Sequence, residues 1–452
     1  MNKFSIGYLY LTVLGLYLID MFLGSEVLTY MAGVLAIPAL LISFVGATKL
    51  FRLLGTLFVS AGVIFFLWGN VSVLELPQLM TNNLSLLAFL AMLPWMQSVV
   101  RAGRFDRRIN QLLQARVKDL GRLYTRSLGT TYLLVAFINL SAIPLIQDVL
   151  KQNLAHFSKA VRDDFISRTT LRGFALVLAW SPMEIMVAIT VDTTGVSFLE
   201  YLPWLLLISG IVLILDGIIG QRFRRVAYEP NGAALTKTIN PLEMTKRIFQ
   251  LSVALTAFLF LVVGIGNLTG LSFIITVTLV IFPFAVVWAI LIKRIRSFWT
   301  IGAKTWWFRL NNMQNFVVLF VALGFFSGSL NETPFLGMIQ EPFMLAANQP
   351  LVVLLFIQFT FLAMAMIGMH PIATIGILQE VVVPLYETMN PMSIGIVFIT
   401  SSLSTASVGT YGITVTMTSQ ATEQNPYLIT LKNMPFALLY GGVGTIIGWL
   451  LI

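Results

Sequence analysis

The chain has no cysteine, only two histidines and few charged residues: Asp, Glu, Lys and Arg make up 10% of its 452 residues. Without cysteine it can form neither a disulfide framework nor a thiolate metal site. His156 and His370 are too few to predict a histidine-ligated metal centre. A soluble domain carries about 25% charged residues. These shortages exclude a secreted disulfide-rich domain and a soluble enzyme.

Hydrophobic residues make up 58% of the chain and gather in long segments. A membrane-spanning helix needs about 20 mostly apolar residues. We predict an all-α polytopic membrane protein with eleven crossing segments. They are 5–24, 28–48, 53–72, 80–99, 171–195, 200–220, 247–267, 271–292, 313–330, 391–418 and 432–451. Two further apolar segments, 127–150 and 350–388, contain a Pro or Gly break and are predicted to be re-entrant hairpins.

The basic residues set the predicted orientation. Of the 28 Lys and Arg residues, 24 fall in four clusters, at 101–126, 151–172, 222–247 and 293–309. With the N-terminus inside and both hairpins re-entrant, every Lys and Arg lies on the inner side, as the positive-inside rule requires. This predicts an outside C-terminus, in the cytoplasmic membrane of a bacterium. Because the net charge of +9 is spread over separate loops, it does not indicate a nucleic-acid surface.

One order of elements occurs twice, in opposite senses across the membrane. The segment 144–149 resembles 376–381, and the break at 181–184 corresponds to 405–408; these pairs lie 232 and 224 residues apart. Chance similarity between apolar segments is the alternative explanation. Inverted repeats with binding sites at interrupted helices are a transporter design.

The repeat predicts four parts of the chain. They are N-terminal scaffold helices at 1–79, a first repeat at 80–225, a linker with scaffold helices and an amphipathic arm at 226–312, and a second repeat at 313–452. The first repeat contains the hairpin 127–150 and an interrupted helix at 171–195. The second contains the hairpin 350–388 and an interrupted helix at 391–418.

Four breaks, at 139–144, 181–184, 368–374 and 401–412, are the candidate binding regions. Irregular backbone at membrane depth persists only inside protein or beside a wet cavity. Helix N-termini at such breaks suit an anion, and helix C-termini suit a cation. The candidate substrate-binding residues are Asn139, Ser141, Ser181, His370, Thr374, Ser404, Thr405 and Ser407. The alternative is that small residues here allow close helix packing.

Glu184 and His370 are the candidates for proton or ion coupling. Glu184 lies beside a break inside an apolar stretch, and an ionisable residue at membrane depth is a functional candidate. Histidine titrates near neutral pH. Alternatively, each is a hydrogen-bonded structural residue. Gln147 and Asp216 lie near segment ends, where we expect them to face water or headgroups.

The layout resembles the ion transporter superfamily, which includes divalent-anion/sodium symporters and the large membrane subunits of TRAP carriers. The segment 368–374, Gly-Met-His-Pro-Ile-Ala-Thr, followed by Asn390-Pro391-Met392, looks like a second hairpin and the start of the next helix. Ser181-Pro182 looks like the first interrupted helix. The hairpin tips diverge from the Ser-Asn-Thr motif of the symporters. The resemblance implies an elevator mechanism, a homodimer, and an anionic substrate driven by sodium or protons.

From these features we expect a secondary active transporter for a small anionic solute, coupled to sodium or protons. Its expected partners are the solute, the lipid bilayer and a second copy of the chain, with no nucleic acid and no cofactor except a sodium ion as one alternative. The alternative function is a flippase or export protein for a lipid or lipid-linked precursor in envelope synthesis. An integral-membrane transferase is a third reading. Because no catalytic constellation stands out, we do not expect an enzyme.

Overall fold

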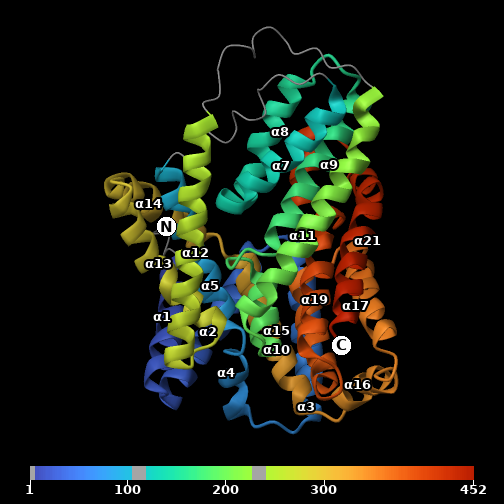
Figure 1. The fold of residues 1–452 in the computed structure, drawn as a ribbon. Helices are drawn as coiled ribbons and strands as arrows, with labels where there is room; N and C mark the ends of the chain where they lie inside the picture. The colour runs from blue at the N-terminus through green and yellow to red at the C-terminus, as the bar shows by residue number, and fades with distance from the viewer. Residues whose placement is uncertain (1–5, 104–118, 226–240) are drawn as a thin grey trace. The chain divides into compact units, whose positions relative to one another are not determined.

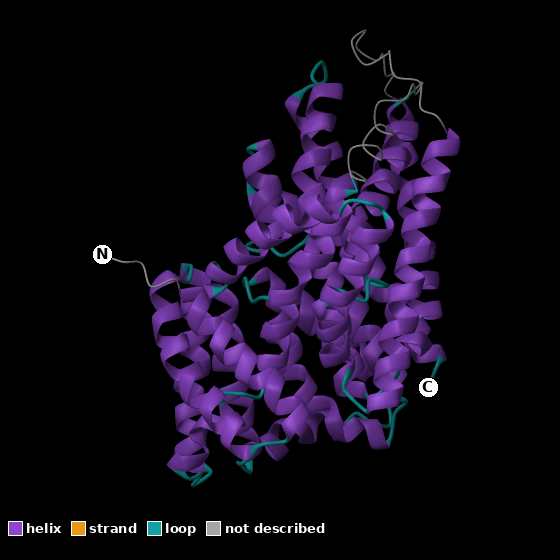
Figure 2. Ribbon diagram, turned by 90° about the vertical axis from the view of Figure 1, so that its left-hand side faces the viewer, coloured by secondary structure: helices purple, strands orange, loops and turns teal. Residues whose placement is uncertain are grey.

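The structure is a computed structural model that describes residues 6–103, 119–225 and 241–452, without the side chains of 137, 138, 141, 225 and 241–248. Throughout this described part the chain is helical, with short loops and no strand (Figure 2). The predicted all-α fold class is therefore confirmed.

Eight helices among the described residues are long and apolar enough to cross a membrane. They are Ile6–Leu23, Glu26–Gly46, Lys49–Trp68, Val73–Ala102, Phe198–Arg224, Phe249–Thr269, Phe273–Leu291 and Gln314–Asn331. Three shorter apolar helices, Ile185–Thr194, Pro350–Met366 and Pro391–Ser407, lie where the sequence predicts broken segments. Together with the composition, these helices indicate a multi-pass membrane protein.

The chain forms two compact units. Unit 1 comprises Met1–Val99, Thr269–Asn348 and Ala373–Thr388. Its helices are α1 (Ile6–Leu23), α2 (Glu26–Gly46), α3 (Lys49–Trp68), η1 (Val73–Glu75), α4 (Leu76–Leu79), α5 (Leu84–Ala102), α13 (Phe273–Leu291), α14 (Ile295–Asn311), α15 (Gln314–Asn331), α16 (Phe335–Leu345), most of α18 (Pro371–Val382) and η6 (Val383–Glu387). Helix α15 packs against α2 and α3, and α14 packs against α1 and α13.

Unit 2 comprises Val100–Leu268, Gln349–Ile372 and Met389–Ile452. Its helices are α7 (Leu120–Ile138), η3 (Asn139–Ser141), α8 (Ala142–Asn153), α9 (Lys159–Leu178), α10 (Ile185–Thr194), α11 (Phe198–Gly220), η4 (Gln221–Arg225), α12 (Pro241–Thr269), α17 (Pro350–Met366), α19 (Pro391–Ser404), η7 (Thr405–Ser407), α20 (Ile413–Thr422) and α21 (Pro426–Leu450). Both predicted interrupted helices are thus divided, one into α9 and α10 and the other into α19 and α20.

Small residues allow the helices of unit 2 to pack closely. Helices α17, α19 and α21 contact one another and lie side by side (Figure 1). Every residue of α19 from Ser393 to Ser404 is buried. A Cβ atom added at Gly444 of α21 would lie 2.0 Å from the Thr400 hydroxyl oxygen of α19. Glycine therefore sets the separation of these two helices, as is common in membrane bundles.

The two interrupted helices of unit 2 share local geometry. Gly195 follows the last residue of α10 and Glu423 follows the last residue of α20, and both residues have a left-handed backbone, with φ of 69° and 54°. Two residues later, Ser197 and Asn425 cap the N-termini of the next helices by accepting a backbone N–H bond. The contacts are also reciprocal, because α10 packs against α19 and α20 packs against α9. The two interrupted helices thus share this local geometry, while the internal repeat stays a prediction.

A buried ion pair joins four helices of unit 2, and it corrects the expectation that Asp216 faces headgroups. Asp216 of α11 is 1% exposed and accepts from Arg172 Nη1 of α9 at 2.5 Å and from the Tyr124 hydroxyl of α7 at 2.8 Å. Arg172 Nε donates to Asn433 of α21 at 2.9 Å. A buried ion pair persists when further hydrogen bonds satisfy both partners. The network therefore ties α7, α9, α11 and α21 together.

Candidate functional site

The first break lies between α9 and α10. Pro182 has no N–H group to continue the helix, and the chain turns through Ser181, whose backbone N–H donates to Leu178 at 3.1 Å. Ser181 is 8% exposed. Glu184 occupies the N-cap position of α10, although its side chain makes no capping hydrogen bond. Its carboxylate lies beside the backbone N–H groups of Ile185 and Met186, where the helix N-terminus favours negative charge.

A directed chain of hydrogen bonds connects this break to α7 and α11. The Trp180 indole N–H donates to the Tyr132 hydroxyl at 2.5 Å. The Tyr132 and Ser209 hydroxyl oxygens are 3.0 Å apart, and the Ser209 hydroxyl donates to the Leu176 carbonyl at 2.9 Å. Because the Ser209 hydrogen is already used, the Tyr132 hydrogen points to Ser209. This chain of hydrogen bonds was not predicted from the sequence, in which the only signal for it is the tryptophan immediately before Ser181-Pro182.

The second break lies between α19 and α20, and its hydroxyl groups bond to nearby carbonyls. Ser404 donates to the Ser401 carbonyl at 2.8 Å, Thr405 to that of Ser402 at 2.5 Å, and Ser407 to that of Ser404 at 2.8 Å. All three donors are at most 2% exposed. In this conformation these hydroxyls can still accept hydrogen bonds or coordinate a cation through their lone pairs. They do not offer hydrogens to an anion.

The remaining donors of the second break are the buried Ser401 hydroxyl, which has no hydrogen-bond partner among the described residues, and backbone groups at the N-terminus of α20. Gly412 is the N-cap residue and supplies no side-chain cap. Helix α21 holds the break in place, because Thr430 donates to the Val408 carbonyl at 3.0 Å and its hydroxyl oxygen lies 3.0 Å from that of Thr410. A Cβ atom at Gly409 or Gly412 would lie 3.1 or 3.0 Å from a backbone carbonyl oxygen, so these glycines allow the chain to turn tightly before α20. The uncapped N-terminus of α20 leaves its first main-chain N–H groups to donate to a ligand.

The hairpin tips hold the other predicted residues. Asn139 follows α7 with a φ of 47° and a ψ of −134°, a strained backbone conformation for a residue that is not glycine. The Ser141 side chain lies outside the described residues. Gly368 has a φ of 92°, and a Cβ atom there would lie 2.7 Å from the Tyr411 ring, so this tip touches the second break. His370 accepts a bond from the Ile372 N–H at 3.3 Å.

Unit 2 thus brings together most, but not all, of the predicted site. The turn η7 contacts α9, α17, α19, α20 and α21, which places Thr405 and Ser407 at the centre of the unit. Thr374 is 3% exposed and belongs to the part of α18 assigned to unit 1. Gln147, expected at a solvated end, is instead fully buried and donates to Thr170 at 3.1 Å and Thr418 at 2.8 Å.

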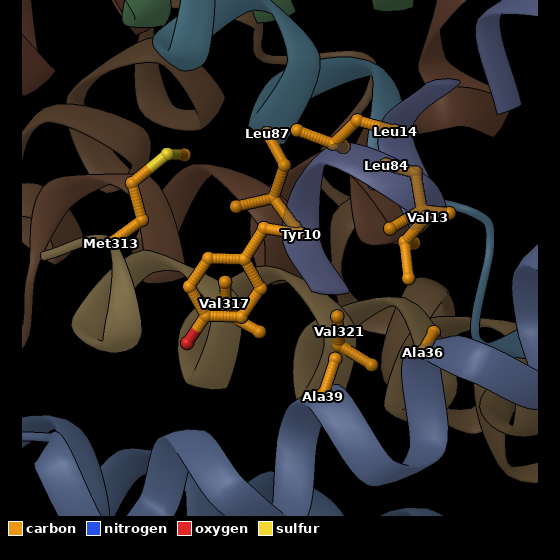
Figure 3. A pocket seen from close by; sticks show the side chains of 10 residues that line it. All are labelled: Tyr10, Val13, Leu14, Ala36, Ala39, Leu84, Leu87, Met313, Val317 and Val321. Atoms are coloured by element: carbon orange, nitrogen blue, oxygen red, sulfur yellow. The ribbon is translucent and has the colours of Figure 1, made fainter. Parts of the chain in front are cut away.

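A separate small pocket lies in unit 1 (Figure 3). Its lining is Tyr10, Val13, Leu14, Ala36, Ala39, Leu84, Leu87, Met313, Val317 and Val321. Its one polar group, the Tyr10 hydroxyl, is paired with Ser43 at 2.6 Å. The apolar lining offers nothing to a charged solute, so the pocket is not the candidate site. Within the described residues, no three His, Asp or Glu side chains gather closely enough to hold a metal ion.

No known protein-family model and no curated protein matches the sequence. A solved structure, that of the YdaH transporter of Alcanivorax borkumensis, matches the fold with a TM-score of 0.56. The match covers 88% of this chain and 97% of that chain, at 16% sequence identity. The chain therefore shares a fold with a solved transporter, while its resemblance to the ion transporter superfamily stays a prediction.

Proposed function

We propose that the protein is a secondary active transporter that moves a small anionic solute across the cytoplasmic membrane, coupled to protons or sodium. The main support is the reciprocal packing of two interrupted helices within unit 2, in which α10 contacts α19 and α20 contacts α9. Such paired breaks expose helix ends inside the protein, where backbone groups can bind a solute and an ion. Likeness to the fold of a solved transporter supports the same proposal.

The N-terminus of α20 is the proposed anion site. It lacks a side-chain cap, so its first main-chain N–H groups can donate to an anion. The hydroxyl groups of Ser404, Thr405 and Ser407 already donate hydrogen bonds to backbone carbonyls. They are therefore better placed to accept from a protonated group or to coordinate sodium than to bind the anion.

We further propose that unit 2 moves as a body, in an elevator-type mechanism. Unit 2 contains both interrupted helices whole, and the Arg172–Asp216 network ties four of its helices together. A packed interior resists gradual deformation, so a unit of this kind shifts more readily than it bends.

Thermal unfolding of the purified protein tests the function. Succinate, citrate and phosphate are each added with sodium chloride or choline chloride. A ligand that binds only the native state stabilises it by about 2.7 kcal/mol at 100 times its dissociation constant. Stabilisation by one anion, followed by gradient-driven uptake of that anion into proteoliposomes, is the expected result. Transbilayer movement of a fluorescent phospholipid, with no anion effect, would instead indicate a flippase.

A further inference from the structure

Among the described residues, the buried hydroxyl of Tyr440 has no hydrogen-bond partner. Tyr440 lies on α21 and is 0% exposed. The two titratable side chains that act on it electrostatically are Tyr132 and Glu184. An unpaired buried hydroxyl costs stability of order 1–3 kcal/mol, so a group that satisfies it in some state of the protein is expected.

The neighbouring side-chain donors already make hydrogen bonds to other groups. Trp180 gives its hydrogen to Tyr132, Tyr132 gives its hydrogen to Ser209, and Ser209 gives its hydrogen to the Leu176 carbonyl. None of these three side chains can donate to Glu184 without breaking an existing bond. In this directed chain the Tyr132 oxygen still has one lone pair, which can accept one further hydrogen bond.

We propose that Tyr440 is the positioning donor for Glu184, an inference that rests on the proposed coupling role of Glu184. When Glu184 is ionised, the Tyr440 hydroxyl donates to its carboxylate, directly or through one water. When Glu184 takes up a proton from the aqueous side, the Tyr440 hydroxyl turns to the free lone pair of Tyr132. Tyr440 keeps its own proton throughout, and only Glu184 gains and loses one.

Helices α17, α19 and α20 carry no titratable side chain. Arg172 and Asp216, on α9 and α11, are paired with each other. The other charged side chains of these helices and of α21 include the ion pairs Lys159–Glu423, Arg162–Asp163, Arg168–Asp164 and Lys432–Asp164, together with the exposed Glu200, and α7 carries Arg122 and Arg126. His370, at the tip of the second hairpin, is a further titratable group of unit 2, so the Glu184→Gln background is needed to assign a pH effect to Glu184. Asp192 of α10 lies eight residues beyond Glu184, or about 12 Å along the helix. A pH effect that depends on Tyr440 should therefore depend on Glu184.

The test is the melting temperature of the full-length protein as a function of pH, which needs no substrate. In Tyr440→Phe the ionised carboxylate loses one donor and keeps the backbone N–H groups of Ile185 and Met186, so the carboxyl holds its proton to higher pH. The midpoint of the pH dependence should move upward by about one unit. In a Glu184→Gln background the same substitution should produce no pH-dependent change. Tyr386→Phe, which removes a buried unpaired hydroxyl from unit 1, is the matched control.

A second variant is needed if Tyr440→Phe does not fold. Replacing Tyr440 with 3-fluorotyrosine, a stronger hydrogen-bond donor of nearly the same shape, should move the midpoint of the pH dependence downward. An unchanged midpoint in the variant that folds, or an equal shift in the Glu184→Gln background, overturns the assignment. Absence of anion uptake by the wild-type protein, together with the expected midpoint shifts, would reject the proposed transport function and keep the Tyr440 pairing.

Discussion

Glu184 is an acidic side chain at a helix break, and its position predicts a role in coupling rather than in solute binding. Replacing Glu184 with glutamine removes the charge and keeps the shape of the side chain, which should separate accumulation of the solute from exchange of the solute. We expect Glu184→Gln to lose gradient-driven accumulation and to retain solute exchange, because exchange needs no net proton movement. Both rates are measured in proteoliposomes. Glu200→Gln, at an exposed acidic residue of α11, is the control, and unchanged accumulation in Glu184→Gln would show that Glu184 is structural.

The Asp216 carboxylate balances the buried positive charge of Arg172, so replacing Asp216 should destabilise the folded protein. Asp216→Asn leaves Arg172 without a counter-charge at 3% exposure, which we expect to cost about 3–5 kcal/mol of unfolding free energy. The measurement is the melting temperature in detergent. Lys159→Met is the control: it breaks the solvent-exposed pair with Glu423, in which the Lys159 ammonium lowers the pKa of the Glu423 carboxyl. It should leave the melting temperature unchanged, and equal losses in both variants would contradict this account.

Sequence reasoning identified Glu184 because a carboxyl group beside a proline break is visible in a linear pattern. It could not pair Arg172 with Asp216, which lie 44 positions apart and meet only after α9 and α11 pack. Nor could it show that Gln147 is buried, because that depends on threonines of α9 and α20. Side-chain partners across helices depend on tertiary contacts that periodicity does not encode.

Among the helices of unit 2, α21 offers a direct test of packing. Gly444 faces Thr400 of α19, where a Cβ atom would lie 2.0 Å from the hydroxyl oxygen, whereas a Cβ atom at Gly442 would meet nothing within 4 Å. We therefore expect Gly444→Ala to lower the melting temperature clearly and Gly442→Ala to leave it nearly unchanged. Both substitutions raise helix propensity equally, so the difference isolates the contact. Equal melting temperatures would show that α19 and α21 separate at little cost.

The helix breaks were predictable because proline and glycine mark them. Pro182 precedes α10, and Gly409 and Gly412 precede α20. The direction of the hydroxyl hydrogens in the second break was not predictable. Serine and threonine in a helix either donate to a carbonyl three or four residues back or face a ligand, and the local sequence is the same in both cases.

For the molecule as a whole, the distribution of basic residues predicts which loops face the cytoplasm. Single cysteines need no background removal, because the chain has none. Ser158 and Asn331 are both exposed in the structure. In intact cells, Ser158→Cys should be protected from an impermeant thiol reagent and Asn331→Cys should react. Labelling at position 158 from outside would contradict the re-entrant hairpin at 127–150 and the orientation derived from it.

The central claim is that unit 2 carries the solute by moving as a body, and a crosslink inside that unit tests it most directly. The Thr410 and Thr430 hydroxyl oxygens are 3.0 Å apart, so cysteines at these two positions are chosen for the crosslink, and mass spectrometry checks that the disulfide forms. Uptake of the anion that stabilises the purified protein is measured for the Thr410→Cys, Thr430→Cys double variant, reduced and then oxidised. Both single variants serve as controls. We predict equal uptake in the two states, because the bond moves with the unit. Uptake that stops on oxidation and returns on reduction would show that the second break must open locally during transport.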